Sequence, residues 1–389
     1  MGFSFKTKIK SLLCICCGAT SLYAGVSIYK NDEKFYKESL MPLIHLLDPE
    51  RAHRLAVFIS KYRLVSKSQF KDSNVLKIRI FGKEFSNPIG LAAGFDKNGE
   101  AVMGLKDIGF GFVEIGSVTP LPQPGNDKPR LFRLSEDRAV INRYGFNSNG
   151  HKDVLMRMEQ LRRNPDLPII GLNLGKNKTS EDPVKDYVDG IETFGRVSDY
   201  LVINISSPNT PNLRTLQNKE NLRHLLKAVV AARNALDVNP KPPLLLKLAP
   251  DLTEQEKKDI ANIISEKDCK VEGLIISNTT IERPSLKSAY QKEAGGLSGA
   301  PLRDVSTQMI KEMTLLTKGD LVIIGVGGIF TGKDAYEKIR AGASLVQVYS
   351  SMVYEGPPII SKIKRELEDI LKKEGHENII QIIGKDVRK

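Results

Sequence analysis

The stretch LVINISSPNT, residues 201–210, places a strand-like apolar run directly before a cluster of hydroxyl and amide side chains. Apart from Asn204, the first five residues are apolar and mostly β-branched, which predicts a buried strand. Residues 206–210 contain two serines but no histidine, cysteine or carboxylate. A serine here lacks the partners that usually activate a nucleophile, so the stretch favours a different chemistry.

Seven further runs have the same form, in which a short apolar segment ends in glycine or polar residues and a helical segment follows. Eight strands alternating with helices predict a covered parallel sheet and, at this number, a (β/α)8 TIM barrel. A doubly wound open sheet is the alternative, but Phe330 occupies the last glycine position of its phosphate fingerprint in GVGGIFTG (325–332). The eight runs are PIGLAAG (88–94), FVEIGSV (112–118), IIGLNLG (169–175), LVINISS (201–207), LLLKLAP (244–250), GLIISNT (273–279), LVIIGVGG (321–328) and LVQVYSS (345–351). The longest insertions between these units are 119–150 and 280–301.

The amino-acid composition limits the classes of protein to which this chain can belong. The chain has 389 residues, 41% of them apolar, with a net charge of +12, which fits a globular protein with a sizeable core. The net positive charge suits a binding partner such as anionic lipid or an anionic substrate, or it reflects solvated lysines on the surface. No nucleic-acid-binding module is recognisable in the sequence. The four cysteines form neither a disulfide framework nor a zinc spacing, which weakly favours a reducing compartment.

The N-terminus predicts a targeting or membrane-anchor segment over residues 1–32. Nineteen uncharged residues, 11–29, follow Lys6, Lys8 and Lys10, and the first acidic residue is Asp32. This length is at the lower edge of a membrane span. We expect a retained organellar anchor; a cleaved presequence or secretory signal is the alternative.

Residues 33–66 predict an amphipathic helix pair, and residues 67–389 the barrel. Apolar residues recur at three- and four-residue spacing, and Asp48-Pro49 separates the two helices. The apolar face either packs on the domain behind it, or it dips into a bilayer surface or lines an apolar tunnel; we favour the second reading.

In a barrel, function lies where the strands end, and small residues, amides and two lysines follow these runs. None of the five histidines is among them, so we predict no metal site and no histidine-based acyl transfer. Glycine turns after the last two runs favour a phosphate site, although ordinary turns also use glycine. Lys247, inside an apolar strand, predicts a buried cation that meets an anion, unless it reaches the rim.

These motifs together resemble the dihydroorotate dehydrogenase family, and the membrane-associated, quinone-linked second class matches best. The resemblance covers about residues 33 to 375. It rests on GLAAGFDKNGE, GFGFVEIGSVTP, INRYGFNSNG, LNLGKNK, NISSPNT, SNTT, GGLSG and GVGGI. It implies a barrel that binds FMN and oxidises dihydroorotate to orotate in pyrimidine biosynthesis, with ubiquinone as electron acceptor. A departure is Asn212, where a glycine is common after the serine loop.

The resemblance also implies roles for individual residues. Ser207 would be the catalytic base, and Lys247 would stabilise the reduced cofactor. His53, Arg133 and Tyr349 would line the inner end of a quinone tunnel. FMN would be held by Ala92, Ala93, Gly94, Ser117, Asn173, Asn204, Lys247, Ser277, Ser298, Gly299, Gly327, Gly328, Tyr349 and Ser350. The substrate would be surrounded by Lys97, Asn142, Arg143, Tyr144, Gly145, Phe146, Asn204, Ser207, Asn209, Asn278 and Thr279.

We therefore expect a monomeric enzyme anchored to the inner mitochondrial membrane, with its catalytic domain outside the bilayer. Another flavin barrel reductase, acting on dihydropyrimidines or dihydrouridine, is an alternative in the same chemistry. A membrane-tethered binding protein that kept the barrel but lost turnover is an alternative from another class.

Overall fold

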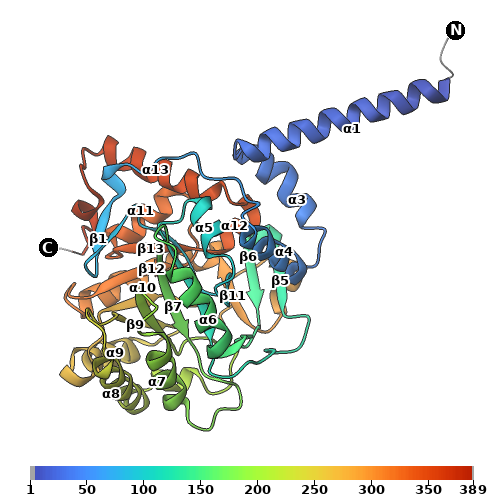
Figure 1. The fold of residues 1–389 in the computed structure, drawn as a ribbon. Helices are drawn as coiled ribbons and strands as arrows, with labels where there is room; N and C mark the ends of the chain where they lie inside the picture. The colour runs from blue at the N-terminus through green and yellow to red at the C-terminus, as the bar shows by residue number, and fades with distance from the viewer. Residues whose placement is uncertain (1–4, 388–389) are drawn as a thin grey trace.

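Eight parallel strands form a closed barrel ringed by helices in the computed structural model, which describes residues 5–387 (Figure 1). Each strand lies within, or within one residue of, one of the eight apolar runs, so the barrel prediction is confirmed and the open sheet is excluded. In barrel order the strands are β10 (Gly273–Ile276), β12 (Val322–Val326), β13 (Leu345–Val348), β3 (Ile89–Leu91), β4 (Phe112–Val118), β7 (Ile169–Leu174), β8 (Tyr200–Asn204) and β9 (Leu244–Leu248).

The strands are buried on both faces, as their nearly continuous apolar sequences require. Helices cover the outside of the barrel, and their apolar stripes complete one large core. They are α5 (Val102–Ile108), α6 (Gly150–Arg162), α7 (Pro183–Phe194), α8 (Lys219–Ala235), α9 (Glu254–Ser265), α10 (Arg303–Leu316), α11 (Gly332–Arg340), α12 (Ser350–Glu355) and α13 (Ile359–Lys373). Two of these helices, α9 and α11, begin with a capping box, in which Thr253 pairs with Glu256 and Thr331 with Asp334.

The two long insertions contribute three strands that the sequence pattern did not reveal. β5 (Leu131–Leu134) and β6 (Ala139–Asn142) pair with β11 (Gly296–Gly299) in an antiparallel sheet that lies beside the barrel. These strands are only four residues long, too short for a clear alternation of apolar and polar residues. A hairpin of β1 (Ile78–Ile80) and β2 (Lys83–Phe85) precedes the first barrel strand.

The N-terminal segment forms a long helix followed by the predicted helical pair. α1 (Phe5–Tyr29) projects away from the barrel (Figure 1), and its residues 9–29 are long and apolar enough to cross a membrane. The first member of the pair is broken into α2 (Glu33–Phe35), a π-helical turn (Tyr36–Leu40) and α3 (Met41–Ile44). The second, α4 (Pro49–Lys61), begins where the Asp48 side chain accepts a hydrogen bond from the Arg51 N–H.

Candidate functional site

A cavity of about 500 Å³ runs from the helical pair into the mouth of the barrel. Apolar side chains of α3 and α4, such as Ile44, Ala52 and Ile59, line its outer part, and polar residues at the strand ends line its inner part. One continuous space therefore joins an apolar entrance to a polar interior.

Most of the predicted site residues share this cavity. All three predicted quinone-site residues line it, as do all predicted cofactor residues except Asn173 and all predicted substrate residues except Arg143. Arg143 instead donates a hydrogen bond to Glu293 at 2.6 Å. Asn173 is buried behind the lining, where its amide donates to Glu114 at 2.9 Å and its carbonyl oxygen accepts from Ser117 and Asn204. Neither of these two side chains lines the cavity in this structure.

Lys247 is buried at the centre of the barrel beside a carboxylate. Its Nζ lies 3.8 Å from Glu114 Oε1, and the ammonium makes no hydrogen bond within the described residues. Burial lowers the pKa of Lys247, and the charge of Glu114 opposes that shift. Beside it, the buried Gln347 Oε1 has no hydrogen-bond partner among the described residues. A free donor and a free acceptor thus face the same cavity, as the edge of a polar ring system requires.

Two glycines after β12 shape another part of the cavity. Gly327 and Gly328 have φ values of 119° and 69°, which L side chains rarely adopt. Neither of their backbone N–H groups has a hydrogen-bond partner among the described residues. β13 lies next to β12, and beyond its end the Ser350 hydroxyl is 2.9 Å from that of Ser298. Unpaired N–H groups and hydroxyls fit an anion such as a phosphate.

The two serines that follow β8 have different environments. Ser206 is fully buried, and its hydroxyl donates to Asn204 at 3.1 Å and accepts from Asn278 at 2.9 Å. Ser207 lines the cavity, and within the described residues its hydroxyl accepts only the Asn209 N–H, at 3.3 Å. The second serine is therefore the one whose hydroxyl is available to a ligand.

Lys97, Tyr144 and His53 connect the inner and outer parts of the cavity. The Lys97 ammonium lies 4.1 Å from the centre of the Tyr144 ring, and burial lowers its pKa to about 7. His53 Nε2 donates to the Phe95 carbonyl at 2.8 Å, so Nδ1 accepts from the Tyr144 hydroxyl at 3.1 Å. Burial, with the charge of Lys97, lowers the pKa of His53 to about 3, so the imidazole is neutral at physiological pH.

Arg133 carries an unpaired donor into the outer part of the cavity. Its Nη2 donates to the Leu47 carbonyl, while its buried Nη1 has no partner among the described residues. A guanidinium N–H in an apolar setting suits a ligand that presents a carbonyl oxygen.

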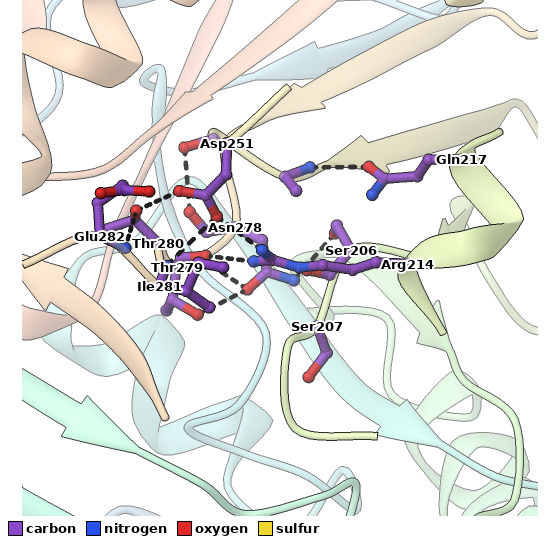
Figure 2. Close-up of polar contacts among 12 residues, drawn as sticks. Ser206, Ser207, Arg214, Gln217, Asp251, Asn278, Thr279, Thr280, Ile281 and Glu282 are labelled. Carbon is purple, nitrogen blue, oxygen red and sulfur yellow. Dashed lines mark hydrogen bonds and ion pairs between the residues drawn. The ribbon is translucent and has the colours of Figure 1, made fainter. Parts of the chain in front are cut away.

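An ion pair of Arg214 and Asp251 connects the loops around Ser207. Figure 2 shows Arg214 reaching from the loop after β8 to Asp251, after β9, and to Thr279, after β10. Neither Arg214 nor Asp251 lines the cavity.

Sequence reasoning missed these supporting residues. Glu114 stands in FVEIGSV as the only charge in a buried run, which was a usable signal; its carboxylate also accepts from Gln347 at 2.6 Å. Arg214 and Asp251 lie in polar loops, where a charged residue is unremarkable. Glu50 and Arg130, 2.9 Å apart, join α4 to the barrel and likewise had no local signal.

Known proteins are similar to this chain over most of its length. The family model described as "Dihydroorotate dehydrogenase" matches residues 75–371. "Dihydroorotate dehydrogenase (quinone), mitochondrial" from Mus musculus is 52% identical over 96% of this chain and 95% of its own length. "Dihydroorotate dehydrogenase (quinone)" from Rhodospirillum rubrum is 51% identical over 89% of this chain and 94% of its own.

A solved structure is similar over nearly the same range. The crystal structure of DHODH from Eimeria tenella in complex with ferulenol has a TM-score of 0.85 and 42% sequence identity. The match covers 89% of this chain and 99% of that one.

Proposed function

The chain belongs to the dihydroorotate dehydrogenase family, in its quinone-linked branch, and on this premise we propose how its residues carry out the reaction. The activity is the oxidation of dihydroorotate to orotate in pyrimidine biosynthesis, with a quinone as electron acceptor, and the family identity implies a flavin. The observation that carries our assignment of residues is the single cavity, which joins the Ser207 hydroxyl, Lys247 and the apolar helical pair.

We propose that the flavin is FMN. The unpaired N–H groups of Gly327 and Gly328, with Ser350, would hold its single phosphate. The ring would lie over Ala92, Ala93 and Gly94, small enough for close approach, with its polar edge near Lys247. When bound, a flavin would supply hydride-accepting chemistry toward the substrate and two-electron transfer to the quinone. The remaining cofactor contacts would come from Ser117, Asn204, Ser277, Ser298, Gly299 and Tyr349.

Substrate would bind between the amide cluster and Lys97. Asn142, Asn209 and Asn278 present directed donors and acceptors, which suit a small, planar, anionic ligand with amide groups. Lys97 would pair with the ligand's carboxylate. Gly145, Phe146, Tyr144 and Thr279 complete the lining, while Arg143 holds the loop through Glu293.

Ser207 would take the proton from C5 of dihydroorotate and pass its own hydroxyl proton to a neighbouring hydroxyl, such as that of Thr210, or to a water near Phe146. A serine hydroxyl is a weak base at its own pKa, so proton loss would be coupled to hydride departure from C6. Such help is typically worth roughly 10²–10⁴ in rate. Lys247 would stabilise negative charge at the adjacent ring edge as it develops, and because its side chain is only 6% exposed, solvent would screen that interaction little.

The outer cavity would receive the quinone. Its apolar walls suit an isoprenoid tail, and the free Nη1 of Arg133 would donate to a quinone carbonyl at the inner end. Neutral His53 would serve as a hydrogen-bonding residue rather than as a charge.

We propose that residues 1–32 anchor the chain in the inner mitochondrial membrane, that residues 33–66 form the tunnel, and that residues 67–389 form a monomeric catalytic domain outside the bilayer. Residues 1–4 and 388–389 lie outside the described residues.

Separated half-reactions test this proposal. Purified protein is loaded with FMN, mixed anaerobically with dihydroorotate, and then given ubiquinone while flavin absorbance is followed. We expect bleaching and then recovery of colour. In Ser207→Ala, bleaching falls at least about 100-fold, the scale of a lost general base, while flavin content and reoxidation stay normal. Wild-type bleaching by Ser207→Ala would remove this serine from its role.

A further inference from the structure

The loop that carries Ser207 is fastened from behind by one guanidinium. Arg214 Nε donates to the Ser206 carbonyl at 2.9 Å, and Nη2 donates to the Thr279 carbonyl at 2.9 Å (Figure 2). Nη1 donates to Asp251 Oδ2 at 2.6 Å. The Arg214 side chain is 22% exposed and that of Asp251 12%, so water competes little for these bonds.

Asp251, the ion-pair partner of Arg214, also accepts hydrogen bonds from the loop after β10. Its carboxylate accepts hydrogen bonds from the Thr280 hydroxyl and, at 3.3 Å, from the Ile281 N–H. The loops after β8, β9 and β10 therefore meet at one ion pair. Two of these loops carry proposed substrate contacts, Ser207 and Asn209 on one, and Asn278 and Thr279 on the other.

The position of the Ser206 carbonyl bears directly on Ser207. This carbonyl and the Ser207 N–H belong to one rigid peptide unit, so a bond to the oxygen restrains the position of the Ser207 Cα, from which the side chain leaves. The Ser207 hydroxyl has little else to orient it, because its one hydrogen bond within the described residues is the 3.3 Å contact from Asn209. The orientation of this hydroxyl therefore depends on where the backbone holds the Ser207 Cα.

We propose that Arg214, held by Asp251, is a positioning residue that aims the Ser207 hydroxyl at the substrate. This inference rests on the proposed role of Ser207 as the base. Arg214 itself does not line the cavity, so it acts through Ser207 and not by touching substrate or flavin. A displacement of about 1 Å costs as much as 10²-fold in rate when geometry is demanding.

The test compares Arg214→Gln and Asp251→Asn with wild type in the two separated half-reactions. We expect bleaching by dihydroorotate to slow about 10- to 100-fold in Arg214→Gln, with Asp251→Asn affected less because Arg214 keeps its two carbonyl bonds. Arg214→Lys, which can reach only some of these acceptors, should fall between wild type and Arg214→Gln. Flavin content, and ubiquinone oxidation of flavin reduced with dithionite, should stay within about twofold.

A double-mutant cycle separates an effect on the orientation of the Ser207 hydroxyl from a general loss of order in the site. If Arg214 acts through Ser207, adding Arg214→Gln to Ser207→Ala should slow the residual bleaching less than about threefold. Wild-type bleaching in Arg214→Gln, or an equal loss in both backgrounds, would overturn the inference. Normal bleaching by Ser207→Ala alone would instead overturn the base assignment, so the two failures are distinguishable.

Arg223→Gln is the matched control. Arg223 is similarly exposed, at 26%, and pairs with Glu266 at 2.9 Å, but this ion pair starts from the outer helix α8. It should lose comparable stability in thermal unfolding without a change in bleaching. If Arg223→Gln slows bleaching as much as Arg214→Gln does, the Arg214 effect reflects lost stability and the inference is wrong.

Discussion

The ammonium of Lys247 lies 3.8 Å from the carboxylate of Glu114, with the two side chains 6% and 0% exposed. The carboxylate also accepts hydrogen bonds from Asn173 and Gln347, whereas the ammonium has none within the described residues. Glu114 therefore compensates the charge of the buried ammonium but leaves the N–H donors of Lys247 free, as the proposed contact with a flavin requires.

Replacing Lys247 with methionine should separate stability from catalysis. Removing one partner of a buried pair leaves an uncompensated charge, so we expect a loss of about 3 kcal/mol in unfolding free energy. Flavin reduction should slow about 10²- to 10³-fold, the usual cost of one preorganised electrostatic group. The double variant Lys247→Met/Glu114→Gln should recover part of the stability, measured by denaturant unfolding, but none of the rate. Equal recovery of both would contradict a role for the cation in flavin reduction.

Orotate binding should depend on the protonation of Lys97. Its pKa is lowered to about 7, so the ammonium is charged below that pH and neutral above it. Because the ligand is an anion, its dissociation constant should be flat below about pH 6 and rise above pH 7, by up to tenfold per pH unit. Calorimetry on FMN-loaded protein measures this. Lys97→Arg keeps its charge throughout and should show no such rise; a parallel rise would assign the titration elsewhere.

The contact between α4 and α5 should control quinone turnover. A Cβ at Gly104 would lie 1.9 Å from the Ser60 carbonyl oxygen, so Gly104→Ala must displace the end of α4. We expect a several-fold higher KM for ubiquinone and unchanged bleaching by dihydroorotate. Gly25→Ala, where a Cβ meets nothing within 4 Å, is the control. If Gly104→Ala alters only the dihydroorotate step, the tunnel assignment fails.

Gly328 should be needed for flavin binding. Alanine at φ 69° costs about 1–2 kcal/mol, and its Cβ would lie 2.6 Å from the Arg303 backbone, moving the N–H groups proposed for phosphate. We expect at least tenfold weaker FMN binding in fluorescence titration. Gly375, with φ 75° and nothing near its Cβ, is a matched control because Gly375→Ala carries the same strain far from the cavity. Equal FMN affinity in both variants would place the phosphate elsewhere.

Removing residues 1–29 should release the protein from membranes. The helix over residues 9–29 is apolar and only 6% buried, so it contributes little to the core of the barrel. We expect the truncated protein to fail to float with phospholipid vesicles, while bleaching by dihydroorotate in detergent stays normal. Flotation equal to that of the full chain would assign membrane attachment to the helical pair alone.

The barrel and much of the cavity lining could be predicted because their signals are local. Each strand is a short apolar run, and the residues just past its end reach the same rim once the sheet closes. That is why Lys97, Ser207 and Asn278, which lie in three different units, line one cavity. At Asn212, where a glycine is common in the family, φ is 56°, a left-handed conformation that asparagine tolerates better than most residues.

Contacts between distant segments had no such signal. β11 pairs with β6 across more than 150 residues, and its four residues carry no clear period. The guanidinium of Arg143, a residue of the INRYGFNSNG motif, donates to Glu293, and the motif did not indicate this partner, because a backbone position does not determine where a long side chain finds its partner.

By itself, the sequence determined the eight-stranded barrel, the apolar N-terminal helix and the ring of hydroxyls, amides and lysines at the strand ends. These follow from hydrophobic periodicity and from the fact that parallel strands end at one edge. Only the tertiary structure decided that Glu114 faces Lys247 and that Arg214 donates a hydrogen bond to the Ser206 carbonyl, just before Ser207. Those contacts join residues from separate strands and loops, and their geometry exists only once the barrel has closed.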